Sequence, residues 1–246
     1  MQKKVYFISD VHLGLTDRAH DRKKEDLLLE FLRKIEDSCE TLVINGDLFD
    51  YWFEYKYVVP KYFYALLTAL RSMREKGIEI IYIMGNHDFG HRNYFESELD
   101  IKINENDITQ EFFAKKFYIS HGDGKSNKDY GYKILKKILR NKLSLFLFRW
   151  IHPDLGIRMA SKSSKTSRSY TGKKDWGERD GMREFAENKI KEGFDYVVMG
   201  HRHKAELSQI ANGYYLDLGD WVGKETFAVF DGEEMKLEFV RDFLAG

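Results

Sequence analysis

The sequence predicts a layered α/β protein that forms one domain. Helical and strand-like segments alternate along most of the 246 residues, a pattern typical of layered α/β folds and not of all-helical or all-β chains. Five short apolar runs rich in β-branched residues each end in a motif of Asp, Asn, Gly or His. With 43% hydrophobic residues, the chain can bury one sizeable core. We expect a single domain over residues 1–246, with an insertion at about 125–174.

The elements of the first half follow from apolar spacing and from stop signals. Apolar residues recur at a helical spacing over 22–39. Pro60 is typical of the first turn of a helix, and Gly77 is typical of a C-terminal stop. We therefore expect helices over 22–39 and 60–76, and strands over 5–8, 41–45, 78–84 and near 101–103 and 111–113.

The second half resumes this alternation after the insertion. The dipeptide Asp231-Gly232 is a strong signal of a β-hairpin between the last two strands. We expect a helix over 181–192 and strands over 117–119, 195–199, 214–216, 227–230 and 236–240.

The insertion concentrates positive charge. Residues 125–174 hold fourteen Lys or Arg against two acids, about +12 in a chain of formal net charge zero. The run 143–151 is nearly all apolar and reads either as a core helix or as an element that meets a lipid surface or a lipid ligand. The polar stretch 161–170 fits a basic, hydroxyl-rich loop for phosphate contacts, or a flexible linker.

Composition excludes several classes of protein. The single cysteine, Cys39, excludes a disulfide framework and a multi-cysteine zinc site. No apolar run reaches the ~18 residues that a spanning helix needs. A strand is expected within five residues of the N-terminus, so we expect no signal peptide. These features predict a soluble or peripheral protein in a reducing compartment.

Side chains at the ends of the five strands predict a metal centre. Ligands in open α/β sheets bind outside the carboxyl ends of the strands, so these side chains should meet. Carboxylate, imidazole and amide oxygen suit Mn²⁺, Fe²⁺ or Zn²⁺, and Mn²⁺ is our first choice. Seven ligands suit two ions bridged by one carboxylate, for which Asp47 is the natural candidate. The seven candidates are Asp10, His12, Asp47, Asn86, His121, His201 and His203.

These motifs, in this order, resemble the signature of calcineurin-like metallophosphoesterases. The resemblance implies a four-layer α/β/β/α sandwich, here with an inserted helical lid, and a bridging water or hydroxide as nucleophile. It also implies that His87 stabilises phosphoryl charge or protonates the leaving group, positioned by Asp88. It places one ion on Asp10, His12, Asp47 and His203, and the other on Asp47, Asn86, His121 and His201.

Within that family the chain is most similar to UDP-2,3-diacylglucosamine pyrophosphatases of lipid A synthesis. Trp52 after the second motif, the pair Asp129 and Tyr132, and the basic insertion have counterparts there. The resemblance implies attack at the α-phosphate to give UMP and 2,3-diacylglucosamine 1-phosphate, at the cytoplasmic side of the inner membrane. His87 stands where the best-known branch has Arg. The implied head-group residues are Asp129, Tyr132, Lys162, Lys165 and Arg168, and the run 143–151, with Phe146 and Trp150, would meet the acyl chains.

Two other functions fit parts of the sequence. A phosphoesterase acting on nucleic acid could use the basic insertion, but its aromatic residues would be interleaved for base stacking, whereas here they form one apolar block. A non-catalytic membrane-binding protein would not need seven ligands with an open side. We therefore expect a nucleotide-linked lipid substrate and a peripheral membrane contact, with no nucleic acid and no obligate protein partner.

Overall fold

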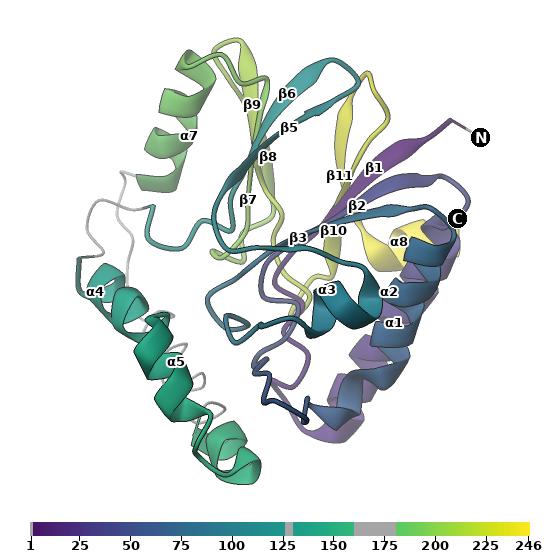
Figure 1. Ribbon diagram of the computed structural model, residues 1–246. Coiled ribbons are helices and arrows are strands. Elements are labelled where there is room, and N and C mark those ends of the chain that lie inside the picture. The colour runs from purple at the N-terminus through teal and green to yellow at the C-terminus, as the bar shows by residue number, and fades with distance from the viewer. Residues whose placement is uncertain (1, 126–129, 160–180) are drawn as a thin grey trace.

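The computed structural model describes residues 2–125, 130–159 and 181–246. Two β-sheets pack face to face and helices cover both outer faces (Figure 1). Parallel strands form the centre of each sheet, and antiparallel strands extend one edge of the first sheet and both edges of the second. The expected four-layer α/β/β/α sandwich is confirmed.

The first sheet holds most of the strands from the two ends of the chain. β1, β2, β3 and β4 run parallel, and β10 joins β1 in the antiparallel sense. The predicted hairpin pairs β10 with β11. In spatial order the strands are β11 (Met235–Phe239), β10 (Thr226–Phe230), β1 (Lys4–Ile8), β2 (Cys39–Asn45), β3 (Glu79–Ile83) and β4 (Ile103–Asn104).

The second sheet is built from the middle of the chain. Its three central strands are parallel, and each edge strand pairs in the antiparallel sense with its neighbour. In spatial order the strands are β5 (Ile108–Phe112), β6 (Lys115–Ile119), β7 (Tyr196–Met199), β9 (Gly213–Asp217) and β8 (Glu206–Ile210).

Alternation along the strands divides the core into layers. In β1, Tyr6 packs with the helices on the outer face, against Phe31 of α1. Its neighbour Phe7 points to the other side and stacks on Phe117 of β6 at 5.9 Å, inside the layer between the sheets. The outer helices of the first sheet are α1 (Arg18–Ile35), α2 (Tyr64–Glu75), α3 (Tyr94–Leu99) and α8 (Val240–Ala245), and α7 (Gly181–Lys191) covers the second sheet.

The first helix differs from its predicted range. It begins at Arg18 because the carboxylate of Asp17 accepts hydrogen bonds from the first free N–H groups of the helix, and Cys39 already belongs to β2. A short 3₁₀ turn, Lys61–Phe63, separates Pro60 from α2. Strand β8 and helices α3 and α8 were not predicted, because each is short and partly exposed.

The described residues of the insertion form a helical arm, which we call the lid, beside the loops at the carboxyl ends of the strands (Figure 1). It comprises α4 (Tyr130–Leu139), α5 (Lys142–Phe148) and the helical residues 153–159. The Asn141 side chain caps α5 by accepting from the Leu143 N–H at 2.9 Å. No residue of α5 is buried, so the core-helix alternative is wrong for this segment. No helix of the described ranges is long and apolar enough to cross a membrane.

Candidate metal centre

The predicted ligands meet at the carboxyl ends of five strands, β1, β2, β3, β6 and β7. In one group, His203 Nε2 lies 3.4 Å and His12 Nε2 lies 3.6 Å from Asp10 Oδ1. The two histidine nitrogens are themselves 3.3 Å apart. One ligand atom from each of these three residues lies within 4.8 Å of the others, a spacing that suits a shared cation.

Asp47 connects this group to a second one. Its Oδ2 lies 3.3 Å from His121 Nε2 and 3.8 Å from His12 Nε2. Asn86 Oδ1 is 3.0 Å from the same nitrogen of His121. A single carboxylate oxygen thus faces both groups, as the bridging assignment requires.

His201 lies beside the second group. Its ring centroid is 5.4 Å from that of His121, and its backbone N–H donates to Asp10 Oδ2 at 2.8 Å. The structure therefore brings all seven predicted ligands together, from loops as distant in sequence as residues 10 and 203.

The loops that carry these side chains have an unusual backbone. Left-handed conformations are uncommon for residues other than glycine and concentrate at functional sites. Here they let consecutive ligands leave a strand end in the same direction. The residues concerned are Asp10 (φ 52°), His12 (φ 51°), Asp47 (φ 53°), His201 (φ 72°) and His203 (φ 58°).

Two glycines allow the loops to approach closely. A Cβ atom at Gly85 would lie 2.1 Å from Asp47 Oδ1. One at Gly200 would lie 2.1 Å from Ser9 Oγ and 2.5 Å from Asp10 Oδ2. Any larger residue would displace a candidate ligand, so these glycines are part of the site.

Hydrogen bonds around the cluster orient the imidazoles. His121 Nδ1 lies 2.8 Å from the carbonyl oxygen of Asn45. A carbonyl can only accept, so Nδ1 carries a proton, and in the neutral form of the ring Nε2 would present its lone pair to the cluster. The Nδ1 atoms of His12 and His203 lie 3.4 Å from Asp50 and 3.3 Å from Asp220, respectively, so each ring has a carboxylate on the side away from the cluster.

The electrostatics of the cluster favour added positive charge. Burial raises the pKa of Asp10, but His12 and the charges of His121 and His203 lower it to about 2. Burial lowers the pKa of His12 and His121, but the carboxylates raise these values to about 9 and about 10. Without a cation, the carboxylates thus draw protons onto the histidines.

The donor set also fits divalent metal. Asp10 Oδ1 is buried and has no hydrogen-bond partner in the described part of the chain, an arrangement that costs free energy unless a cation or water completes it. Burial, with the neighbouring charge of His121, lowers the pKa of His201 to about 4. A neutral imidazole is the form that binds metal.

The candidate catalytic pair is separated in the structure. His87 lies at the rim of the cluster, and its Nδ1 is 3.6 Å from Asp50 Oδ1. The carboxylate of Asp88 is fully buried and accepts from the N–H of Gly85 and of Leu48 and from the hydroxyl of Tyr82. Asp88 therefore fixes the loop as a whole, and Asp50 is the carboxylate near the His87 ring.

Glu54 ties the loop after β2 to the loop after β3. Its Oε1 accepts from the indole N–H of Trp52 at 3.0 Å. Its Oε2 accepts from the backbone N–H groups of Arg92, Asn93 and Tyr94 at 2.8–3.0 Å, at the start of α3. Sequence reasoning missed this carboxylate, because the positions that it joins are about forty residues apart.

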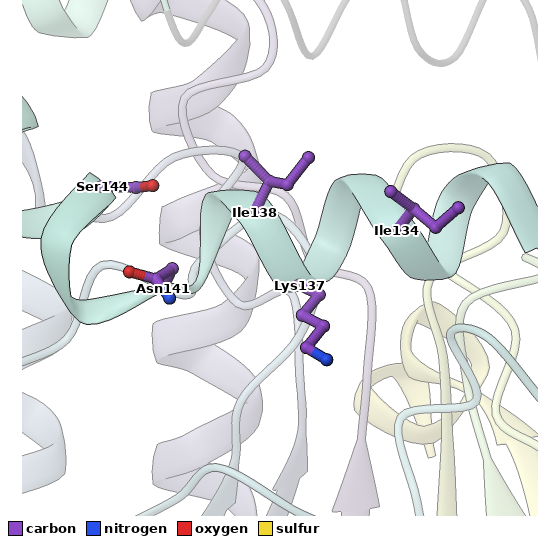
Figure 2. Close-up of a pocket in the computed structure, with 5 residues that line it drawn as sticks. All are labelled: Ile134, Lys137, Ile138, Asn141 and Ser144. Atoms are coloured by element: carbon purple, nitrogen blue, oxygen red, sulfur yellow. The ribbon is translucent and has the colours of Figure 1, made fainter.

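The predicted substrate residues are only partly visible. Asp129, Lys162, Lys165 and Arg168, like the loop 161–170, lie outside the described residues, as does the side chain of Tyr132 on α4. Phe146 and Trp150 belong to the lid, are 52% and 78% exposed, and meet edge to face at 6.2 Å. An open hollow of about 340 Å³ lies on the lid, and Figure 2 labels the residues that line it, Ile134, Lys137, Ile138, Asn141 and Ser144.

The four-layer fold and its Asp, Asn and His cluster define a metal-dependent hydrolase. The sequence model of the family described as calcineurin-like phosphoesterase matches residues 3–205. The chain belongs to this family.

Relatives match nearly the whole chain. A UDP-2,3-diacylglucosamine hydrolase of Porphyromonas gingivalis is 31% identical over 98% of this chain and 99% of its own length. The protein of that name from Yersinia pseudotuberculosis serotype O:1b is 27% identical over 87% of this chain and 90% of its own. Among solved structures, the phosphoesterase YfcE from E. coli aligns with 97% of this chain and 94% of its own, at 15% identity and a TM-score of 0.48.

Proposed function

We propose that the protein hydrolyses the diphosphate of UDP-2,3-diacylglucosamine to UMP and 2,3-diacylglucosamine 1-phosphate, by attack of water at the α-phosphate. The observation that carries this proposal is the lid, which presents exposed apolar side chains and several cations beside the Asp, Asn and His cluster. The names of relatives that match the chain along nearly its full length support the same substrate.

The proposed ligand sets divide the cluster at Asp47. Asp10, His12, Asp47 and His203 would hold one divalent cation, and Asp47, Asn86, His121 and His201 the other. Mn²⁺ suits this mixture of donors best, with Fe²⁺ or Zn²⁺ as alternatives. When bound, the cations would lower the pKa of a water and stabilise the attacking and leaving oxygens of an in-line displacement.

The residues around the cluster would do the remaining work. Asp50 lies against the rings of both His12 and His87, so it can hold each in position. His87, 11% exposed at the rim, can donate a proton or a hydrogen bond to a phosphoryl oxygen. Histidine gives one such contact where arginine would give a bidentate pair, so the phosphate should be gripped less tightly here than in an arginine branch.

The lid would hold the lipid part of the substrate. Its exposed apolar residues gain free energy when they leave water, about 0.8 kcal/mol for each buried CH₂ group. The Lys and Arg side chains of the same segment suit the diphosphate, with Lys162, Lys165 and Arg168 proposed on the phosphate side. Apolar residues at least 38% exposed are Ile134, Ile138, Leu139, Leu143, Phe146, Leu147, Trp150, Leu155, Ile157 and Met159.

The same composition suits a membrane surface. Exposed aromatic and aliphatic residues among cations are typical of elements that lie in the interface of an anionic bilayer. We propose a peripheral contact with the cytoplasmic side of the inner membrane, where a lipid substrate can be taken up. We also propose that residues 1–246 form a single domain, in which the lid is an insertion.

The principal alternative is a calcineurin-like phosphoesterase with a different substrate, such as a phosphodiesterase or a nuclease. His87 in place of arginine favours it, since it is the generic residue of the family. If the protein were a non-catalytic membrane-binding protein, the buried cluster would have no catalytic role. Turnover of a small phosphodiester that is lost in EDTA and restored by Mn²⁺ would exclude that last possibility.

A double substitution in the lid tests the substrate. Phe146→Ser with Trp150→Ser should greatly reduce kcat/KM for UDP-2,3-diacylglucosamine and leave a small phosphodiester almost unaffected, because the small substrate never meets the acyl contacts. Phe113→Ser is the matched control, since this 42% exposed residue lies at the end of the second sheet away from the metal ligands. Thermal melting should first verify folding.

Two results would contradict the proposal. Equal losses on both substrates, with an unchanged melting temperature, would exclude the lid as the acyl-binding element. Hydrolysis in ¹⁸O-water should label UMP, and label in the lipid phosphate instead would refute attack at the α-phosphate.

A further inference from the structure

Helix α4 of the lid is joined to the body by a charged cluster. Asp123, two residues after His121, is 7% exposed. Its Oδ2 lies 2.6 Å from Lys136 Nζ and 3.7 Å from Arg140 Nη2, and both cations are on α4. A mostly buried carboxylate at the end of β6 thus meets two lid cations one helical turn apart.

Arg140 also reaches a second ligand-bearing loop. Its Nη2 donates to the carbonyl oxygen of Gly85 at 2.6 Å, and its guanidinium lies 6.0 Å from the ring of Phe89. The Arg140 side chain is 19% exposed, so solvent competes little for these contacts. The planar guanidinium can serve a carbonyl and a carboxylate together, which is the geometry found here.

The segment that receives this hydrogen bond is held from both sides. The Gly85 N–H donates to Asp88 Oδ1 of the body at 2.8 Å, and the Gly85 carbonyl accepts from the lid. The next residue is Asn86, whose amide oxygen lies 3.0 Å from His121 Nε2, and His87 follows. A shift of the Gly85 peptide would therefore move a candidate ligand and a candidate catalytic residue together.

We propose that Arg140 is a positioning residue that couples the lid to the Asn86–His87 segment, with Asp123 holding its guanidinium in place. The part of this inference that concerns acyl chains rests on the proposed function. The contact between Arg140 and Gly85 should affect turnover of any substrate. A substrate bound to the lid would restrict the movement of α4. Through Arg140 it would also restrict the movement of Asn86 and His87, beside the reacting phosphate. Through this coupling, the lid would raise kcat in addition to helping the substrate bind.

Arg140→Gln tests the coupling in the full-length protein loaded with Mn²⁺. Loss of an outer contact to a metal ligand typically costs about 10–100-fold in activity or metal affinity. We expect kcat to fall by about that factor on both UDP-2,3-diacylglucosamine and bis(4-nitrophenyl) phosphate, with much smaller changes in KM, and Mn²⁺ to bind more weakly. Arg140→Lys, which keeps the charge and a donor, should recover part of the loss. Lys102→Gln, which removes an exposed charge on the body and away from the lid, should match the wild type.

Asp123→Asn provides a second variant, because it removes the charge that holds Arg140 and keeps the size of the side chain. It should lower kcat in the same direction, and Asp123→Asn with Arg140→Gln should lower kcat by much less than the product of the single effects. Independent, multiplicative effects would refute the coupling. An Arg140→Gln variant with unchanged kcat on both substrates, or with a loss confined to KM for the lipid, would also refute it.

The two proposals fail in different ways. If the wild type does not cleave UDP-2,3-diacylglucosamine but Arg140→Gln still slows the small phosphodiester, the substrate is wrong and the coupling stands. If the lipid is cleaved normally by both proteins, the coupling is wrong and the substrate stands. A lower melting temperature with unchanged kcat on both substrates would show that Arg140 only stabilises the lid.

Discussion

Gly85→Ala should release metal although it changes no ligand. The added methyl carbon would lie 2.1 Å from Asp47 Oδ1 and 2.3 Å from the Asp47 backbone nitrogen, whereas ordinary contacts begin near 3.4 Å. Either the methyl or the carboxylate must move by about 1.3 Å, and a misplacement of about 1 Å at a catalytic group can cost ~10²-fold in rate. The second contact is backbone, so rotation of the Asp47 side chain alone cannot relieve the clash.

The assay separates a lost ligand from a weakened fold. Overpacking typically costs about 1–3 kcal/mol, so the melting temperature in EDTA should fall moderately. The rise in melting temperature on adding Mn²⁺ should shrink much more, because the Asp47 carboxylate, the proposed bridge, is displaced. Gly223→Ala is the control, since the nearest atom to its added carbon would be 3.9 Å away. Wild-type Mn²⁺ affinity and turnover in Gly85→Ala would refute the reasoning.

The other predictions concern single side chains around the cluster. Asp47→Ala should lose metal and turnover together, because two cations without their bridging carboxylate repel each other, and metal analysis of the purified variant checks this. His87→Ala should keep its metal while kcat falls about 10²–10⁴-fold; a fall below about tenfold would make His87 a structural residue. Burial raises the pKa of Glu54, but His91, Trp52 and backbone N–H groups lower it to about 2, from 4.5. Its ionised form therefore stabilises the fold above about pH 4.5, and this stabilisation is lost as pH falls toward 2. Glu54→Gln should be less stable than the wild type at pH 7, by on the order of 3 kcal/mol in urea unfolding, and the difference should shrink across that window.

Local sequence patterns predicted the layers and the meeting of the candidate ligands. Each ligand motif directly follows an apolar run, and an apolar run that ends in polar residues is a signal confined to about ten neighbouring positions. The direction of parallel strands then brings the motifs together, so Asp10 and His203, 193 positions apart in the sequence, could be expected to meet only because both follow strands.

Long-range support for the ligands could not be predicted in this way. Asp50 stands between His12 and His87, and Asp220 behind His203, yet spacing along the chain does not predict these contacts with the rings. The family resemblance implied that Asp88 positions the imidazole of His87. The structure turns its carboxylate into the core instead, where three donors surround it, because successive side chains in a tight loop point in different directions.

The left-handed backbone at five candidate ligands lowers the stability of the fold in return for placing these side chains. Asp10, His12, Asp47, His201 and His203 each occupy a conformation that glycine adopts freely and that costs other residues about 1 kcal/mol or more. Selection for a stable fold alone would favour glycine at all five positions. A library selected only for thermal resistance should therefore gather glycines there and yield robust proteins that have lost their metal chemistry. Thermostable variants of this chain are best sought away from the strand ends.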